Sequence, residues 1–168
     1  DPELTALLSD SLVVLRSKAF PIKPFRIIGD IGLRSLWWHY RLLCDLAKKE
    51  KIDLLYLPVP PHYSALLGIL LFRARGIPYA VDYIDPWVYP SPGSSVLFSK
   101  AWWALHLARC LEPIALKHVS LITGVAPKYF EDVYRRYSWL GNVPSLGVPY
   151  GAEESDYQYL RDHPRPAT

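Results

Sequence analysis

The sequence predicts an α/β protein built on a parallel β-sheet with helices on both faces. Short apolar runs alternate with longer amphipathic segments along the chain, which is the pattern of strands alternating with helices. Glycine and proline residues mark most of the boundaries between these segments. A hydrophobic content of 51% with 21% charged residues is typical of a folded domain. Strands joined through helices imply right-handed crossovers and therefore parallel strand pairing.

The first part of the chain predicts two strands around one helix. Leu12–Leu15 is a short β-branched run that predicts a strand, and the proline-containing stretch Phe20–Phe25 predicts a loop. Apolar residues recur at helical spacing over 33–49, with lysines at the end where the helix dipole favours them. Ile52–Leu57 predicts a buried strand that Pro58 ends.

The second part continues the alternation. A helix over Ser64–Arg75 ends at Gly76, a residue suited to a helix C-terminus, and Ser94 or Ser95 is suited to cap a long helix that runs to about Lys117. The remaining expected elements are a strand at Tyr79–Ile84, a strand at Val119–Thr123, a helix at Ala126–Tyr137 with Pro127 in its first turn, and a strand at Leu146–Tyr150. These elements predict a Rossmann-like domain over residues 1–152. The polar tail 153–168 contains two prolines and predicts the start of an interdomain linker.

Composition excludes several classes of protein. A net charge of +3 is too small for a dedicated nucleic-acid binder, and no apolar run approaches the roughly 20 residues of a transmembrane helix.

Cys44 and Cys110 lack the spacing of a zinc or disulfide site, so we expect reduced core cysteines and a cytoplasmic protein. No metal-binding or cofactor motif is present, and we expect neither. Because the sequence contains no methionine, we expect a fragment, a processed form or the ordered part of a longer protein.

Candidate site residues follow the predicted strands, because ligands of open parallel sheets bind beyond the carboxyl ends of the strands. Asp85 is the candidate catalytic residue. The candidate substrate-binding residues are His62, Tyr63, Trp87, Gly124, Tyr150, Gly151 and Glu153. The Asp85 carboxylate is suited to accept hydrogen bonds from a sugar beside the aromatic ring of Trp87, whereas Asp82 or Asp85 could instead cap a turn before the long helix. His62 is suited either to contact a ligand or to start a helix.

Two tryptophan pairs leave a further alternative open. Trp37–Trp38 and Trp102–Trp103 each lie on a predicted helix next to cationic residues. This combination is typical of a peripheral membrane contact, but it also fits ordinary packing of a wide apolar helix face.

Three segments resemble successive parts of the N-terminal domains of family 4 GT-B glycosyltransferases. They are ARGIPYAVDYIDPW (74–87), HVSLITGVAPKYFEDVYRRY (118–137) and LGVPYGAEESDY (146–157). The resemblance implies two facing Rossmann-like domains, with this chain as the acceptor-binding one and a C-terminal domain that holds most of the nucleotide sugar. The opening strand and glycine-rich loop of that family are not recognisable before Leu12, so we expect a domain truncated at its start.

The resemblance also implies a reaction, which is retaining transfer of a sugar from a nucleotide diphosphate sugar to a glycan or a lipid-linked acceptor, as in polysaccharide biosynthesis. Asp85 would lie near the reacting sugar and Gly151 near the cleft. The chain alone is expected to be inactive. A peripheral position at the inner face of the membrane is the alternative to a free cytoplasmic protein. Two other hypotheses are a non-catalytic module that binds a protein partner or an anionic membrane, and a different Rossmann-type enzyme such as a nucleotide-sugar epimerase.

Overall fold

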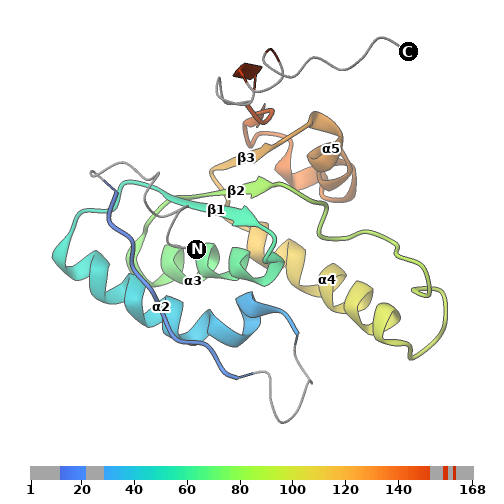
Figure 1. Cartoon of the computed structure of the whole chain (residues 1–168), viewed down its shortest axis with the longest axis horizontal. Helices are drawn as coiled ribbons and strands as arrows, with labels where there is room; N and C mark the ends of the chain where they lie inside the picture. The colour runs from blue at the N-terminus through green and yellow to red at the C-terminus, as the bar shows by residue number, and fades with distance from the viewer. Residues whose placement is uncertain (1–11, 22–28, 152–156, 159–160, 162–168) are drawn as a thin grey trace.

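The chain forms an α/β structure in which helices flank a four-stranded parallel sheet (Figure 1). A computed structural model describes residues 12–21, 29–151, 157–158 and 161. The strands, in the order in which they lie in the sheet, are β1 (Leu55–Val59), β2 (Tyr79–Tyr83), β3 (Leu121–Gly124) and β4 (Ser145–Gly147). The α-helices are α2 (Ile31–Lys49), α3 (Leu66–Arg75), α4 (Lys100–Leu116) and α5 (Pro127–Arg136), and short 3-10 helices are η1 (His62–Ala65) and η2 (Ser138–Leu140). The predicted α/β class and parallel sheet are confirmed, and the arrangement is consistent with a Rossmann-like fold.

Among the described residues, the helices that connect the strands lie on one face of the sheet. The hydroxyl of Tyr79 in β2 donates to the carbonyl of Ala115 in α4, 2.7 Å away. The close approach of Phe130 in α5 to Gly124 in β3 places α5 on the same face. The expectation of helices on both faces is therefore wrong for this part of the chain. Strands that follow chain order across a sheet, joined by crossovers of one hand, put successive helices on the same side.

The opposite face of the sheet carries a short chain of hydrogen bonds. The Tyr56 hydroxyl lies 2.9 Å from Thr123 Oγ1, which donates to Asp82 Oδ1 at 2.6 Å. Tyr56 is on β1 and Thr123 is on β3, so the contact passes over β2 where Ala80 faces Tyr56 in the strand register. The small side chain of Ala80 leaves room for this crossing.

The strand predicted at Leu12–Leu15 does not form. Residues 12–21 have no regular secondary structure, and the side chain of Val13 is 83% exposed. This segment is held at its end instead, because Phe20 N donates to Arg34 O and Arg34 Nη1 donates to Phe20 O. A short β-branched run forms a strand only where a neighbouring strand can pair with it.

Helix boundaries follow the capping residues. Asp30 Oδ1 accepts from Leu33 N at 2.9 Å, so α2 begins slightly before the predicted Leu33. The long helix begins at Lys100 because Ser99 is its cap, through a 3.0 Å bond from Trp102 N to Ser99 Oγ. The prediction that Ser94 or Ser95 starts this helix is wrong. Of the two aspartates considered as caps of a turn before the helix, Asp82 instead accepts a hydrogen bond from Thr123 Oγ1 in the sheet. Gly76, with φ +71°, ends α3 as predicted.

Pro58 lies inside β1 rather than after it. β1 is the edge strand of the described sheet, and the bond from Leu55 N to Pro78 O shows that odd-numbered residues direct their N–H groups toward β2. The missing N–H of Pro58 therefore faces the open edge, where it costs no hydrogen bond.

One apolar core holds the sheet to its helices, with Tyr79, Val81, Leu116 and Ile122 fully buried. Cys44 is half-buried, but Cys110 is exposed, so the prediction that both are core cysteines is wrong for Cys110. The strip of α4 that carries Cys110 faces away from the sheet. Among the described residues, none of the helices combines the length and apolar character needed to cross a membrane.

Candidate functional site

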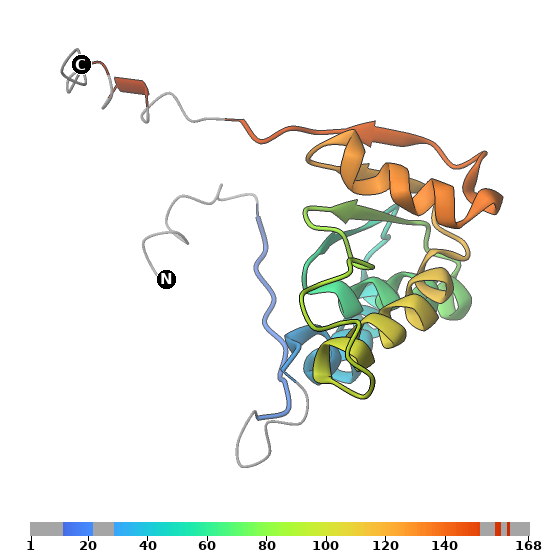
Figure 2. The same ribbon diagram turned by 90° about the vertical axis from the view of Figure 1, so that its right-hand side faces the viewer.

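The carboxyl ends of the strands carry the connections that form the candidate site. Figure 2 looks onto this edge, where the arrows of Figure 1 end. Ile84 N and Asp85 N both donate to Val59 O, at 3.0 and 3.3 Å, and so tie the turn after β2 to the end of β1. The two connections predicted to carry site residues are thus held side by side.

Three of the predicted site residues come together in an aromatic cluster. The rings of His62 and Trp87 are stacked, with centroids 6.0 Å apart and an interplanar angle of 18°. Tyr63 meets Trp87 edge to face at 5.5 Å. His62 Nε2 also lies 3.4 Å from the backbone oxygen of Asp85, which links the cluster to the candidate catalytic residue. These three residues, which come from two different connections, therefore lie together, and their role in binding a substrate stays a prediction.

The cluster forms the wall of a cavity of about 190 Å³, which we call the aromatic pocket. Its wall consists of His62, Tyr63, Trp87, Tyr89 and Ser91, and its floor of Ala101, Ala104, Leu105 and Ala108 in α4. The three alanines recur at helical spacing and so lie on one face of the helix. Their small side chains leave the space that the aromatic rings surround.

The wall of the aromatic pocket is neutral near pH 7. Burial lowers the pKa of His62 below its ordinary value because a buried imidazolium loses hydration, although Asp30 and Asp85 oppose this change. Burial also raises the pKa of the Tyr63 hydroxyl. A neutral imidazole and a protonated phenol both supply hydrogen bonds without charge, which suits an uncharged polar ligand. The carboxylates of Asp30 and Asp85 are the negative charges that act most on His62, and Asp85 is exposed.

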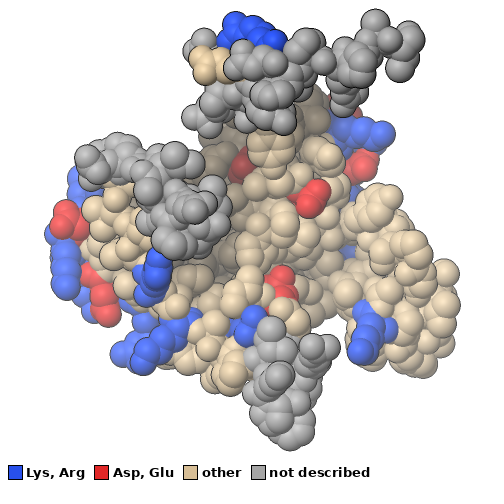
Figure 3. Space-filling model, in the orientation of Figure 1, with Lys and Arg blue, Asp and Glu red and all other residues tan. Residues whose placement is uncertain are grey.

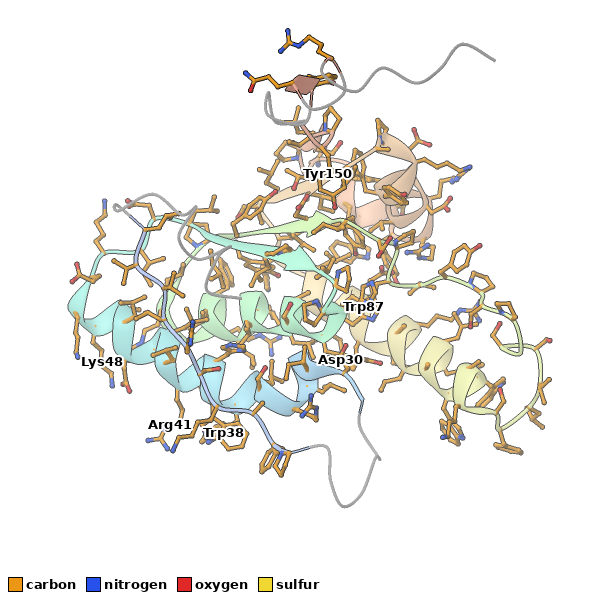
Figure 4. The ribbon with its side chains drawn as sticks, in the orientation of Figure 1. Asp30, Trp38, Arg41, Lys48, Trp87 and Tyr150 are labelled. Carbon is orange, nitrogen blue, oxygen red and sulfur yellow. The ribbon has the colours of Figure 1, made fainter. Side chains whose placement is uncertain are left out.

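The other predicted site residues do not join the aromatic pocket. Gly124 is buried against α5, and a Cβ there would lie 2.8 Å from the Phe130 ring, so this glycine serves close packing of helix on strand. Tyr150 is 71% exposed and follows β4, well separated from Trp87 (Figure 4). Gly151 has open space around it. Glu153 lies outside the described residues.

A second cavity adjoins the first and was not predicted. It has a volume of about 540 Å³ and lies beyond the carboxyl ends of β2 and β3, with Tyr89 lining both cavities. We call it the basic pocket. It is lined by Arg109 of α4, by Lys128, Tyr129, Asp132 and Arg136 of α5, by Ala126 just before α5, and by Pro86, Val88, Tyr89 and Pro90 of the connection after β2. Lys128, Asp132 and Arg136 recur every fourth residue, and this spacing was the signal in the sequence that they share one helix face.

A buried carboxylate lies behind the basic pocket. Glu112 of α4 is 0% exposed, and its oxygens accept from Tyr83 and Tyr137 hydroxyls, each at 3.0 Å, and from Arg136 Nη2 at 2.7 Å. The sequence signal for this cluster was a single acidic residue in an otherwise apolar stretch of α4. Its effect is to fix Arg136 at the wall of the pocket.

Within the described ranges, no group of His, Cys, Asp and Glu side chains is arranged to hold a metal ion. The described residues at this edge supply hydrogen-bonding groups, aromatic rings and charged side chains. A comparison with protein-family models finds none that matches the chain, and a comparison with curated proteins finds no match either.

Proposed function

We propose that the chain is the acceptor-binding side of a retaining GT-B glycosyltransferase of the family 4 type, and that a sugar ring of the acceptor occupies the aromatic pocket. The observation that carries this proposal is the stacked cluster of His62, Tyr63 and Trp87 at the carboxyl edge of a parallel sheet. The C–H face of a sugar packs well on an aromatic ring, and neutral hydrogen-bonding groups at the rim suit its hydroxyls.

Asp85 has a distinct place in this proposal. Its backbone is anchored to β1 and to His62, while its carboxylate is exposed beside the pocket. A carboxylate held in this way is suited to accept a hydrogen bond from an acceptor hydroxyl. The nucleotide sugar, in this proposal, is held mainly by a second domain facing this edge, and the sugar is transferred across the interface.

Replacing Trp87 by Ala is expected to weaken glycoside binding by about tenfold or more, because an aromatic contact in a desolvated pocket contributes on the order of 1–2 kcal/mol. The measurement is saturation-transfer NMR of the full chain with a panel of methyl glycosides, followed by titration of the best binder. Trp37→Ala is the control for loss of a tryptophan outside the pocket, since Trp37 is 58% exposed on α2 and lines a different cavity.

A second variant tests the pocket without removing a buried ring. Ala104→Phe fills the pocket from its floor at an exposed helix position and is expected to weaken binding as much as Trp87→Ala. No saturation transfer to any glycoside, or equal binding by the wild-type chain and the filled variant, would argue against the proposed acceptor site.

A second candidate function, peripheral binding to an anionic membrane, is favoured by one exposed surface. Val96, Leu97, Phe98 and Trp103 are each more than half exposed, and we call them the apolar tip. Phe98 has φ +60°, an uncommon conformation for a residue with a side chain. The chain from 86 to 111 contains no acidic residue, and its only charged residues are Lys100 and Arg109.

The apolar tip projects from the body of the molecule. The connection before α4 and the start of that helix extend away from the sheet in Figure 1, and the same corner is almost wholly uncharged in Figure 3. Exposed aromatic and aliphatic side chains next to cations fit the interfacial region of an anionic bilayer.

Leu97→Asp combined with Phe98→Asp is expected to weaken binding to phosphatidylcholine–phosphatidylserine vesicles by about a hundredfold. Burial of each apolar side chain in the bilayer contributes on the order of 1.5–3 kcal/mol to the binding free energy. Vesicle flotation measures the change. Val13→Asp combined with Val14→Asp is the control of equal charge, because both valines are apolar and exposed, at 83% and 53%, but lie on a different segment. If flotation is absent for the wild-type chain, or unaffected by the tip substitutions, this candidate function is rejected.

A further inference from the structure

The basic pocket combines a large opening with an excess of cationic groups. Its volume of about 540 Å³ exceeds that of the aromatic pocket, and Arg109, Lys128 and Arg136 line it from two different helices. Asp132 is its one acidic lining residue. Cations contributed by separate elements to one concave surface are suited to surround an anion.

The acidic groups nearby already have partners. Asp132 forms an ion pair with Arg135, and Glu112 is bound by Arg136 at 2.7 Å. In the part of the chain that the structure describes, no ion pair involves Arg109 or Lys128. The charges of these two side chains are therefore available to a ligand.

Arg136 is held in position before any ligand arrives. Its Nη2 donates to the buried carboxylate of Glu112, and its guanidinium lies 5.6 Å from the centre of the Tyr137 ring. A guanidinium has five N–H donors, so the bond to Glu112 leaves others free to face the cavity. A cation fixed in this way loses little side-chain entropy when an anion binds.

From this geometry we infer that the basic pocket binds the phosphate group of a phosphorylated organic ligand. A phosphate has several acceptor oxygens and can therefore bind all three cationic side chains at once. Val88, Tyr89 and Tyr129 add apolar and aromatic surface for the organic part, which a site for a bare inorganic ion would not need.

Tyr89 lines both cavities, so a ligand in the basic pocket lies next to an acceptor sugar in the aromatic pocket. A sugar in the aromatic pocket and a phosphate in the basic pocket would then belong to one molecule, a sugar phosphate or a sugar diphosphate on a carrier. This link to the acceptor rests on the proposed function, whereas the phosphate site itself does not.

The test compares two double variants of equal charge. Arg109→Ala with Lys128→Ala removes the two unpaired cations but keeps Arg136, which supports the fold through Glu112. Arg41→Ala with Lys48→Ala is the control, because both residues lie on α2, away from the basic pocket, as Figure 4 shows. The probes are inorganic phosphate, pyrophosphate and a hexose 1-phosphate, each titrated by calorimetry at constant ionic strength.

The pocket variant is expected to bind the hexose 1-phosphate about tenfold or more weakly than the wild-type chain, while the control changes by about twofold or less. Vesicles containing phosphatidic acid form a separate arm. If the pocket variant loses binding of the soluble phosphates, the site is assigned to a soluble phosphate. If it loses only its binding to the phosphatidic acid vesicles, the site is assigned to a lipid phosphate. Equal weakening in both double variants, or no binding of any probe, would overturn the inference.

Glycoside binding separates this inference from the proposed function. The aromatic pocket does not include Arg109 or Lys128, so neutral glycosides are expected to bind the pocket variant as they bind the wild-type chain. Failure of glycoside binding with intact phosphate binding would reject only the acceptor site. The opposite result would reject only the phosphate site.

Discussion

Glu112→Gln is expected to lower the free energy of unfolding by about 2–4 kcal/mol, which is large against the stability of an ordinary domain. The wild-type carboxylate accepts from three donors while fully buried. An amide of the same shape loses the negative charge that Arg136 requires and turns one N–H₂ group toward these donors. The Arg136 side chain is 28% exposed, so water recovers part of the loss and keeps it below that of a fully buried pair.

Urea unfolding at pH 7, followed by far-UV circular dichroism, measures this change. Glu131→Gln is the matched control, because Glu131 is exposed on α5 and its replacement is expected to alter the free energy of unfolding by less than about 0.5 kcal/mol. A loss below about 1 kcal/mol for Glu112→Gln would mean that the cluster does not stabilise the fold as its geometry indicates.

The same cluster gives the protein a defined response to alkali. Burial and the Glu112 carboxylate raise the pKa of Tyr137 to about 12, and burial followed by Glu112 raises the pKa of Tyr83 well above 10. Below about pH 10 these phenols stay protonated in both states, so their contribution is complete. Between about pH 10 and 12 the unfolded chain loses protons first, and stability therefore falls as pH rises. In Glu112→Gln this decline is expected to be smaller, because the carboxylate no longer opposes ionisation of the phenols.

The wall of the aromatic pocket could be predicted because its residues lie just after strands in the sequence. His62, Tyr63 and Trp87 each follow a strand, and the carboxyl ends of parallel strands meet at one edge. Its floor could not be predicted in the same way. Ser94, Ser95 and Ser99 are equally suited by residue type to cap a helix. In the structure Ser99 is the cap, and its hydroxyl also donates to Gly93 O, which fixes it at the end of the preceding turn. The start of α4 thus depends on a turn that residue type alone does not specify.

The basic pocket and the Glu112 cluster depend on which helices are neighbours. The spacing of Lys128, Asp132 and Arg136 indicated a shared face, but nothing in the sequence states that Arg109 faces it from α4. Glu112 is marked in the sequence only as an acidic residue in a mostly apolar helix, and nothing there indicates that Tyr83, on a strand 29 residues earlier, reaches it. Contacts of this kind arise from the order of strands in the sheet, and the sequence does not determine that order through local propensity.

The strand predicted at Leu12–Leu15 failed for a related reason. Strand propensity describes how a side chain fits a pleated and partly buried surface, and no such surface receives this segment in the described structure. The strand predicted at Tyr79–Ile84 forms as β2, one residue shorter, because it lies between β1 and β3, where both of its edges are paired. The prediction was reliable where burial and pairing agreed with the apolar pattern.

Gly68→Ala is expected to lower the free energy of unfolding by about 2–4 kcal/mol, although alanine favours a helix over glycine by about 1 kcal/mol. A Cβ at this position in α3 would lie 2.2 Å from Cδ2 of the Tyr79 ring, far inside contact distance. The ring cannot move aside easily, because Tyr79 is 0% exposed, its hydroxyl donates to Ala115 O at 2.7 Å, and the same hydroxyl accepts from His118 N at 3.3 Å.

Relief of the clash by a second substitution is the sharper measurement. Tyr79→Val removes the ring while keeping a β-branched residue suited to β2, so the double variant Gly68→Ala with Tyr79→Val is expected to be more stable than the sum of the single losses predicts. Gly29→Ala is the control, because nothing lies within 4 Å of the added Cβ, and the loss is expected to stay below about 0.5 kcal/mol. Strict additivity of the two substitutions would show that α3 does not pack on β2 through Gly68. Coupling of about 1 kcal/mol or more would establish that the glycine is required by the close approach of this helix to the sheet.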